Sequence, residues 1–361
     1  MKPILSALAA NRLNVLLVAA PASWIVHSLA PESPWVFIVA AISLVPLAGI
    51  IGLGTEELAE RSGPAFGGLL NATFGNAAEM IIAVVALNQG HIELVKASIT
   101  GSIVGNLLLV LGAAFFVGGI GRPSQKFDRT AASNAAVLLF LAVVALVMPA
   151  VFDLALYGNL DAHPKALDRL SLFTSFILIA AYLGNLFYAF SSRRDLLHPV
   201  KEKEHVGRHM TAAQATSLLA IGTILTTVEA EILVGSLKSA LGQLGLTELF
   251  VGVVLVAIIG NAAEHYSAIT AARRDQMTLA IEIAVGSSAQ IALLVAPVIV
   301  LYSFAIGQPM SLLFNAFEIA AIAFSVLSAS MVVADGESNW VEGLQLMSVY
   351  LVLALAFYFV P

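Results

Sequence analysis

Apolar segments long enough to cross a lipid bilayer follow one another along almost the whole chain. A membrane-spanning helix needs about 20 mostly apolar residues to cover a hydrocarbon core about 30 Å thick. Eleven windows of this kind are found, at residues 13–30, 35–53, 64–88, 95–118, 131–150, 170–191, 211–240, 249–272, 276–304, 312–333 and 341–360. The sequence therefore predicts an all-α integral membrane protein with about 11 membrane-spanning helices.

The composition agrees with a lipid environment. Of the 361 residues, 59% are hydrophobic and 11% are charged, whereas about 25% of the residues in a soluble chain are charged. The chain has no cysteine, which excludes disulfide bonds, thiolate metal sites and cysteine nucleophiles. We expect the lipid bilayer as a partner, expect no nucleic acid, and leave open whether the chain forms a homo-oligomer.

The positive charges predict an orientation. When the N-terminus is placed in the cytoplasm, 13 of the 17 Lys and Arg residues fall on the cytoplasmic side. The other four are Lys96, Lys165, Arg169 and Lys238. Since short cytoplasmic loops are enriched in Lys and Arg, we expect a cytoplasmic N-terminus and an outside C-terminus. With no long N-terminal extension in view, we expect the plasma (inner) membrane of a prokaryote.

One short motif occurs twice. Gly75-Asn76-Ala77-Ala78-Glu79 recurs letter for letter at 260–264, and Gly101-Ser102 recurs as Gly286-Ser287, both 185 positions later. A second match in the same register argues against chance and indicates an internal duplication. We therefore expect a leading membrane helix (1–30), a first five-helix repeat (31–191), a cytoplasmic linker (192–210) and a second five-helix repeat (211–361).

The duplication predicts an inverted arrangement. Five is an odd number, so the second repeat enters the membrane from the side opposite to the first. Glu79 and Glu264 lie near the middle of their helices and are thus expected to meet near the bilayer midplane from antiparallel helices. A charged side chain there costs about 2.5–3.5 kcal/mol or more, which favours function over packing for both. Inverted repeats with polar residues at the midplane are typical of transporters.

Neighbouring residues supply further oxygen atoms. Gly75 and Gly260 weaken their helices locally and free carbonyl groups, which are tolerated in a membrane only where they line a cavity. Asn76 and Asn261 each lie three residues before a glutamate, on the same helix face. The alternative for these motifs is a small-residue packing surface between helices, which we assign to the four alanines.

Two further windows carry polar stripes at four-residue steps. The stripe in window 95–118 consists of Ser98, Ser102 and Asn106, and that in 276–304 consists of Glu282, Gly286 and Gln290, with Ser287 beside it. A single Ser or Thr in a membrane helix usually bonds to its own helix or a neighbouring one. Because the stripes recur in both repeats, we assign Ser102 and Ser287 to the site.

These groups predict the chemistry of the site. Two carboxylates with amide, hydroxyl and carbonyl oxygens suit a hard divalent cation, Ca²⁺ above Mg²⁺. Two desolvated carboxylates close together cannot both stay charged, so an empty site takes up protons. Ca²⁺ and protons therefore compete for one site, and this competition is the coupling rule of an antiporter.

Several stretches resemble a known family. "LLNATFGNAAE", "GSIVGNLLLVLG", "IIGNAAEHYSAI", "EIAVGSSAQIALLVAP" and "DGESNWVEG" are similar to signature stretches of the cation/proton exchanger family, the Ca²⁺/H⁺ antiporters of the calcium/cation antiporter superfamily. Sodium/calcium exchangers of that superfamily carry Ser/Thr-Pro-Glu/Asp at the equivalent places, and neither repeat here has that proline.

The resemblance implies a transporter rather than an enzyme, exporting cytosolic Ca²⁺ in exchange for protons by alternating access. Ca²⁺ and H⁺ are then transported substrates, and no cofactor is expected. Glu79 and Glu264 would be the central carboxylates. Around them would lie Asn76, Asn261, Ser102, Ser287, Gly75 and Gly260. The helices at 13–30 and 170–191 would form the bundle that slides between access states.

Further residues fit ion access or gating. Glu56 and Glu231 resemble the family's flanking acidic positions. We add Glu282, Ser98, Asn106, Gln290 and His265 to this group. His265 points about 100° away from Glu264 around the helix, so a packing role is favoured over ligation. For Glu57, Glu60 and Glu229 a solvated face is at least as good an interpretation, and the mixed charge of the linker favours a solvated segment over a regulatory Ca²⁺-binding one.

Two other function classes and one variant are open to comparison. An intramembrane hydrolase would need an aspartate pair, a Ser–His pair or HExxH on membrane helices, and the sequence supplies none of these. A cation channel usually builds a ring of acids by oligomeric symmetry, whereas here the acidic pair arises within one chain. An exchanger driven by Na⁺, or one for a broader range of divalent cations, stays open.

Overall fold

The computed structural model describes residue 8 and residues 11–158, 164–192 and 210–360. It divides into two compact units: unit 1 comprises Met1–His91, Lys201–Glu248 and Ile258–Ala263, and unit 2 comprises Ile92–Val200, Leu249–Ala257 and Glu264–Pro361. Each unit is described by itself. The predicted linker at 192–210 falls almost wholly outside the described residues.

The apolar windows are helical, and the protein is an all-α integral membrane protein. In the described residues, seven helices are long and apolar enough to cross a membrane, or eight if Leu237–Leu244 and Glu248–Gly260 form one broken span. The seven are Pro34–Arg61, Ile92–Gly119, Arg129–Leu156, Lys165–Tyr188, Ala212–Gly235, Met277–Ala305 and Trp340–Phe359.

The remaining apolar windows hold shorter helices. Leu13–Leu29, Ala77–Asn88 and Ala316–Val332 are apolar but have 10 to 17 residues each. The predicted helix at 64–88 is two helices of 12 residues, each about 18 Å long at 1.5 Å per residue. Neither half covers a hydrocarbon core of about 30 Å. Helix breaks explain why windows 64–88 and 249–272 do not pass as uninterrupted spans. Leu13–Leu29 and Ala316–Val332 are instead too short, with at most 17 residues.

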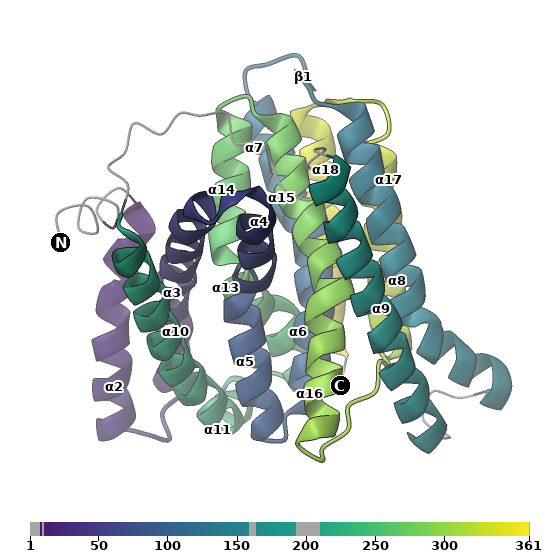
Figure 1. Ribbon diagram of the computed structural model, residues 1–361. Helices are drawn as coiled ribbons and strands as arrows, with labels where there is room; N and C mark the ends of the chain where they lie inside the picture. Colours follow the sequence, from purple (N-terminus) through teal and green to yellow (C-terminus); the bar gives the residue numbers. More distant parts are fainter. Residues whose placement is uncertain (1–7, 9–10, 159–163, 193–209, 361) are drawn as a thin grey trace. The chain divides into compact units, whose positions relative to one another are not determined.

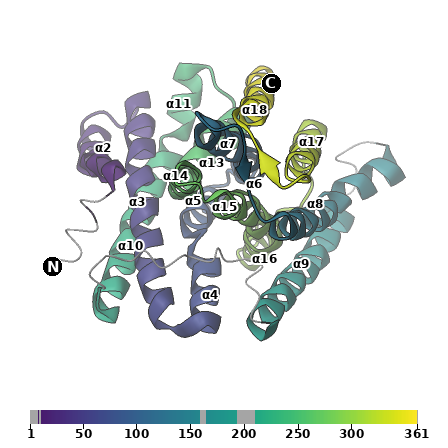
Figure 2. The ribbon, with the colours of Figure 1, turned by 90° about the horizontal axis from the view of Figure 1, so that it is seen from above.

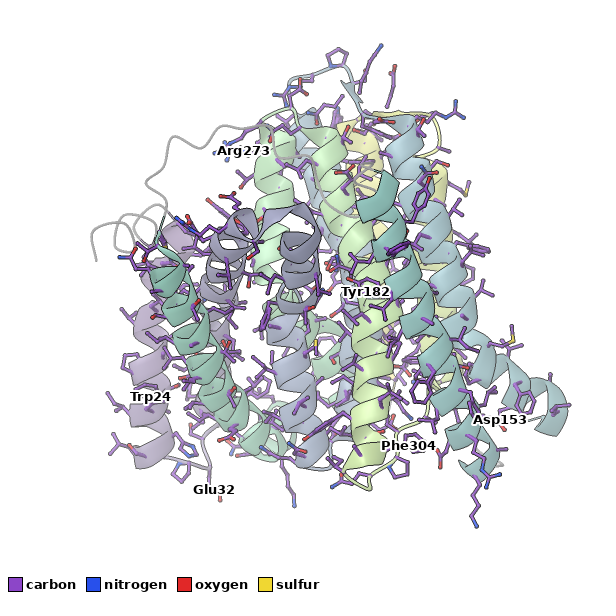
Figure 3. All side chains as sticks on the ribbon, in the orientation of Figure 1. Trp24, Glu32, Asp153, Tyr182, Arg273 and Phe304 are labelled. Atoms are coloured by element: carbon purple, nitrogen blue, oxygen red, sulfur yellow. The ribbon has the colours of Figure 1, made fainter. Side chains whose placement is uncertain are left out.

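Large apolar side chains are exposed on the outer faces of these helices. Phe187, Met331 and Phe359 are 73%, 77% and 77% exposed, and Trp24 stands at the outer side of its helix (Figure 3). Water-soluble surfaces rarely gather so many large apolar groups. These faces suit contact with lipid.

Unit 1 contains a three-helix bundle. A 3₁₀ helix, η1 (Arg12–Val18), leads into α2 (Ala19–Leu29), which is followed by α3 (Pro34–Arg61) and, much later, by α10 (Ala212–Gly235). The three α-helices lie side by side (Figure 1). Gly54 marks the close crossing of α3 and α10, because a Cβ there would lie 2.9 Å from the amide nitrogen of Leu219.

The rest of unit 1 carries the first motif. Here α4 (Gly63–Phe74), α5 (Ala77–Asn88) and α11 (Leu237–Leu244) join the bundle, together with the end of α13 (Ala257–Gly260). A buried cluster of Ile51, Ala77 and Leu219 connects α3, α5 and α10. The helix of the first motif is thus packed directly on the three-helix bundle.

Unit 2 contains two long helices of the same design. The first runs through α6 (Ile92–Val104), η2 (Gly105–Val110) and α7 (Leu111–Gly119), and the second through α15 (Met277–Gln290), η4 (Ile291–Val295) and α16 (Ala296–Ala305). Both η2 and η4 are π-helical turns. Such turns occur often at functional sites. Each one follows a Gly-Ser pair of the sequence repeat, Gly101-Ser102 or Gly286-Ser287, within a few residues.

Among the described residues, seven further helical elements lie wholly or largely in unit 2. They are α8 (Arg129–Tyr157), α9 (Pro164–Ser192), α12 (Glu248–Phe250), η3 (Val251–Val256), α14 (Ala262–Arg273), α17 (Ala316–Val332) and α18 (Trp340–Phe359). Figure 2 shows α8 and α9 side by side. The strands β1 (Gln125–Lys126) and β2 (Glu337–Ser338) form a short antiparallel ladder with Gln125 opposite Ser338.

Candidate cation-binding site

The first motif is a helix break. Helix α4 ends at Phe74 and α5 begins at Ala77, so Gly75 and Asn76 lie between them. Asn76 has φ −100° and ψ 23°, outside the helical region. The Gly75 N–H still donates to the Asn71 carbonyl at 2.8 Å, and the Met80 N–H donates to the Asn76 carbonyl at 3.1 Å. The departure from helical geometry is therefore at Asn76, whereas Gly75 keeps helical dihedrals.

The second motif breaks its helix at the corresponding place. Helix α13 ends at Gly260 and α14 begins at Ala262, with Asn261 between them. As a result, Glu79 lies in the first turn of α5 and Glu264 in the first turn of α14. The N-terminus of a helix carries partial positive charge and stabilises a nearby carboxylate by about 0.3–1 kcal/mol or more. Sequence reasoning missed this contribution, which the Gly-Asn pair before each glutamate could have signalled.

The two motifs meet within unit 1. A Cβ placed on Gly260 would lie 3.1 Å from Cγ and 3.7 Å from Oε1 of Glu79. Asn76 and Asn261 are 2% and 0% exposed, and both carboxylate oxygens of Glu79 are shielded from solvent. The carboxylate of the first motif therefore packs on the backbone of the second, 185 positions away in the sequence.

In unit 2 a hydrogen bond joins the two polar stripes. The Asn106 amide donates to the Ser287 hydroxyl at 3.3 Å, which connects η2 with α15. Ser102, Asn106 and Ser287 are 5%, 1% and 8% exposed. Polar side chains from both Gly-Ser segments are thus buried and in contact with each other. Cation-binding side chains within a membrane need such an arrangement.

Two glycines hold the helix of the second motif against this region. A Cβ on Gly101 would collide with the carbonyl oxygen of Val253 on η3, and a Cβ on Gly252 would collide with the side chain of Ala97 on α6. The α6 and η3 backbones therefore approach as closely as glycine allows. Gly101 of the repeated Gly-Ser pair has a packing role that the sequence did not reveal.

The other predicted residues are placed as follows. Glu264, His265, Glu282 and Gln290 are partly buried in unit 2. Ser98 is also partly buried, and its hydroxyl donates to the Val95 carbonyl of its own helix at 2.8 Å, the ordinary arrangement for a serine in a membrane helix. Of the predicted ligands, Glu79, Asn76 and Asn261 belong to unit 1, and Glu264, Ser102 and Ser287 belong to unit 2.

Two flanking acids lie on exposed faces, and one expectation about their neighbours is wrong. Glu56 and Glu231 are exposed. Glu229, for which a solvated face was at least as good, is 0% exposed. Residues two positions apart point about 200° away from each other on a helix, so one of the pair Glu229 and Glu231 faces inward. That residue is Glu229.

Glu57 and Glu60 were both expected on a solvated face. Glu60 is exposed, as expected, whereas Glu57 is partly buried. The Oε2 of Glu57 accepts a hydrogen bond from the Met210 N–H at 3.1 Å. The Met210 N–H precedes the first turn of α10, so Glu57 satisfies a backbone group that would otherwise lack a partner at a helix end.

One further buried carboxylate lies beside the Gly101-Ser102 segment and was missed. Glu318 on α17 is 1% exposed. Its Oε1 accepts from the Thr100 hydroxyl at 3.0 Å and its Oε2 accepts from the Asn315 N–H at 2.9 Å. The sequence Asn315-x-x-Glu318 is a capping box, a pattern that can be read from sequence. The bond to Thr100 ties this cap to α6.

Comparison with known proteins gives consistent matches. Residues 32–191 and 214–359 match the family described as sodium/calcium exchanger protein. A Ca(2+)/H(+) antiporter of Synechocystis sp. is 43% identical over 363 residues, which cover 96% of this chain and 97% of the relative. A Ca(2+)/H(+) antiporter of Aphanothece halophytica is 41% identical over 364 residues, 96% of each protein.

A solved structure has the same fold. The structure of native YfkE superposes with a TM-score of 0.83 at 38% identity and covers 96% of this chain and 100% of that chain. The similarity therefore extends over whole proteins rather than over one motif. From the matched segments and these relatives it follows that the chain belongs to the sodium/calcium exchanger protein family.

Proposed function

We propose that this protein is a secondary active Ca²⁺/H⁺ antiporter. The observation that carries the proposal is the packing of Glu79 against Gly260, which brings the first GNAAE motif onto the second within unit 1. The relatives named Ca(2+)/H(+) antiporter support the identity of both ions. The protein acts as a transporter, and Ca²⁺ and protons are its substrates.

The ligand chemistry supports calcium. We propose that Glu79 and Glu264 bind the ion, assisted by Asn76, Asn261, Ser102 and Ser287 and by backbone carbonyls at Gly75 and Gly260. All of these ligands are oxygen atoms, which Ca²⁺ accepts in sets of six to eight with flexible geometry. When the ion leaves, the carboxylates lose their counter-charge in an apolar environment, and protons replace it. Exchange follows because Ca²⁺ and protons occupy the same oxygen atoms in turn.

The proposed architecture is 11 membrane helices, one leading helix (1–30) and two inverted five-helix repeats (31–191 and 211–361). Three repeated features support it. The helices break at Gly75–Asn76 and again at Asn261, and π-helical turns occur at 105–110 and again at 291–295. The family match also falls into two segments, 32–191 and 214–359.

The proposed direction of transport is export of cytosolic Ca²⁺ across a prokaryotic plasma membrane, with the N-terminus inside. The distribution of Lys and Arg supports this orientation. Around the central site, we propose that Glu56, Glu231 and Glu282 attract cations to the access routes. Ser98, Asn106, Gln290 and His265 are proposed to line or gate those routes.

Transport in proteoliposomes tests the function. The purified protein is reconstituted, a pH gradient is imposed, and uptake of radioactive Ca²⁺ is measured with and without a Na⁺ gradient. We expect uptake that follows the pH gradient and is abolished by an ionophore that collapses it. Uptake that follows the Na⁺ gradient and ignores the pH gradient would contradict the proposal and favour a Na⁺-coupled exchanger.

A further inference from the structure

A second carboxylate is enclosed within unit 1, apart from the repeated motifs. Glu229 lies on α10, is 0% exposed, and is bonded to serines on two other helices. Ser23 on α2 places its hydroxyl oxygen 2.8 Å from Oε1 and 2.7 Å from Oε2. Ser43 on α3 places its hydroxyl oxygen 2.6 Å from Oε2. The three helices that meet here are those of the bundle in Figure 1.

Each serine hydroxyl has one hydrogen but two acceptor groups within reach, the Glu229 carboxylate and a carbonyl of its own helix. The Ser23 oxygen is also 2.8 Å from the Ala20 carbonyl, and the Ser43 oxygen is also 2.7 Å from the Ala40 carbonyl. A hydroxyl group donates one hydrogen bond and accepts others. Each serine can therefore donate either to Glu229 or to its own helix, and can switch by rotation about one bond.

This geometry satisfies Glu229 in both of its protonation states. When Glu229 is ionised, both serine hydroxyls donate to it. When a proton from water binds at Oε2, the new O–H donates to the Ser43 oxygen, and the Ser43 hydroxyl turns to the Ala40 carbonyl. Ser23 donates to Oε1 or to the Ala20 carbonyl. No buried polar group loses its partner in either state, so the proton can be taken up or released without repacking.

The charge of Glu229 is not balanced by a side-chain cation. In the described part of the chain, Glu229 takes part in no ion pair. The titratable groups on α10 and on the described elements that pack against it are Glu231, His27, Glu56, Glu57, Glu60, Arg61, Glu79 and Lys238. His27, one turn along α2 from Ser23, is exposed.

The distances around Glu229 are those of hydrogen bonds. The serine and carboxylate oxygens here are 2.6–2.8 Å apart, which is the length of an O–H···O hydrogen bond. The ligand that suits this arrangement is a proton.

We propose that Glu229, Ser23 and Ser43 form a second, buried proton-binding site that is separate from the calcium-binding carboxylates. The site is connected to the first motif through helix packing, because α10 also packs against α5. Leu219 of α10 lies in one buried cluster with Ala77 of α5, and Phe74 and Ile81, on either side of the helix break, pack against this cluster. A proton on Glu229 changes the hydrogen bonds that hold α2 and α3 to this helix.

Infrared spectroscopy on the full-length protein tests the site without measuring transport. A protonated carboxyl group gives a C=O stretching band that shifts on deuteration. We expect such a band in the wild type at acidic pH and its loss at alkaline pH. Glu229→Gln should remove the component that this carboxyl group contributes, and other protonated carboxyl groups account for any band that remains. The matched control is Glu231→Gln, two positions along α10 on the exposed face, which should keep that component.

Each other outcome overturns the proposal. A spectrum that Glu229→Gln leaves unchanged at every pH, a component lost equally in Glu231→Gln, or a component that never disappears at high pH would each contradict an exchangeable proton on Glu229. Loss of the band on adding Na⁺ or Ca²⁺ at constant pH in Glu79→Gln protein would show a cation site instead.

Two serine variants keep the proposal testable if Glu229→Gln does not fold. Ser43→Ala and Ser23→Ala retain the carboxyl group but remove a hydrogen-bond partner, so the frequency of the same band should shift. An unshifted band in both would overturn the assignment. None of these spectra depends on Ca²⁺/H⁺ exchange, so failure of the proposed transport function and failure of this site are distinguishable.

Discussion

Two glutamates in unit 1 solve the problem of a carboxylate in apolar surroundings in different ways. Glu79 lies in the first turn of a helix that follows a break, with the backbone of Gly260 against its side chain. Glu229 lies within the unbroken helix α10 and is bonded to serines. The first environment offers helix-end backbone groups and amides, and the second offers rotating hydroxyls. We therefore propose cation exchange at the broken helices and proton binding alone at the intact one.

The largest expected effect is the loss of a central carboxylate. Glu79→Gln removes the negative charge while keeping the shape of the side chain. Mutation of a residue that only hydrogen-bonds to a metal ligand lowers metal affinity by about 10–100-fold. Because Glu79 is proposed to bind the ion itself, we expect Ca²⁺ uptake in proteoliposomes to fall by more than about 100-fold. Glu264→Gln should do the same, because it occupies the equivalent turn of α14.

A different result is expected for the same substitution at Glu229. Glu229→Gln should retain Ca²⁺ uptake with an altered dependence on pH, because it holds a proton and no cation. Near-normal exchange in Glu79→Gln would contradict the assignment of Glu79 to the central site. Complete loss of exchange at every pH in well-folded Glu229→Gln would contradict the different roles proposed for the two carboxylates.

A smaller effect is expected from crowding the contact between the motifs. Gly260→Ala places a Cβ 3.1 Å from Cγ of Glu79, so the carboxylate must shift. Overpacking of this kind costs about 1–3 kcal/mol, and we expect about a tenfold loss of Ca²⁺ affinity, measured by calorimetry or by uptake at graded Ca²⁺ concentration.

The matched control is Gly52→Ala on α3, where, among the described residues, an added Cβ meets no atom within 4 Å. We expect this variant to bind Ca²⁺ as the wild type does. Equal losses in the two variants would mean that helix glycines matter generally and that the contact at Gly260 has no special role.

Much of the fold was readable from the sequence, because membrane helices must be long and apolar. Every predicted window is mainly helical in its described residues. The number of uninterrupted spans was not readable, since the average hydropathy of a window does not register a two-residue break. At 64–88 the only local signal was Gly75-Asn76, and a single glycine is common in intact membrane helices.

The candidate site was predicted in part. The repeat and the cost of buried charge identified Glu79, and the structure adds its contact with Gly260. The inward residue of α10 could not be identified, because a helix that is apolar on all sides has no polar face to show which side is buried. A solvated face was therefore at least as good an interpretation for Glu229, although it is the buried residue of the pair. The packing roles of Gly101 and Gly252 depend on η3 lying against α6, a contact between segments about 150 positions apart.

The smallest expected effect concerns the hydroxyl that bonds Glu229 across helices. Ser43→Ala removes the 2.6 Å hydrogen bond between α3 and α10, and a hydrogen bond to a charged group contributes about 1.5–3 kcal/mol.

The control is Ser325→Ala on α17, where an equally buried hydroxyl bonds to the Ala321 carbonyl of its own helix at 2.6 Å. That bond is local and its acceptor already has a helical partner, so we expect a loss of only a few tenths of a kcal/mol. Thermal unfolding in detergent should therefore show a clear decrease in midpoint for Ser43→Ala and little for Ser325→Ala. Equal decreases would mean that Ser43 serves its own helix and that Glu229 does not depend on it.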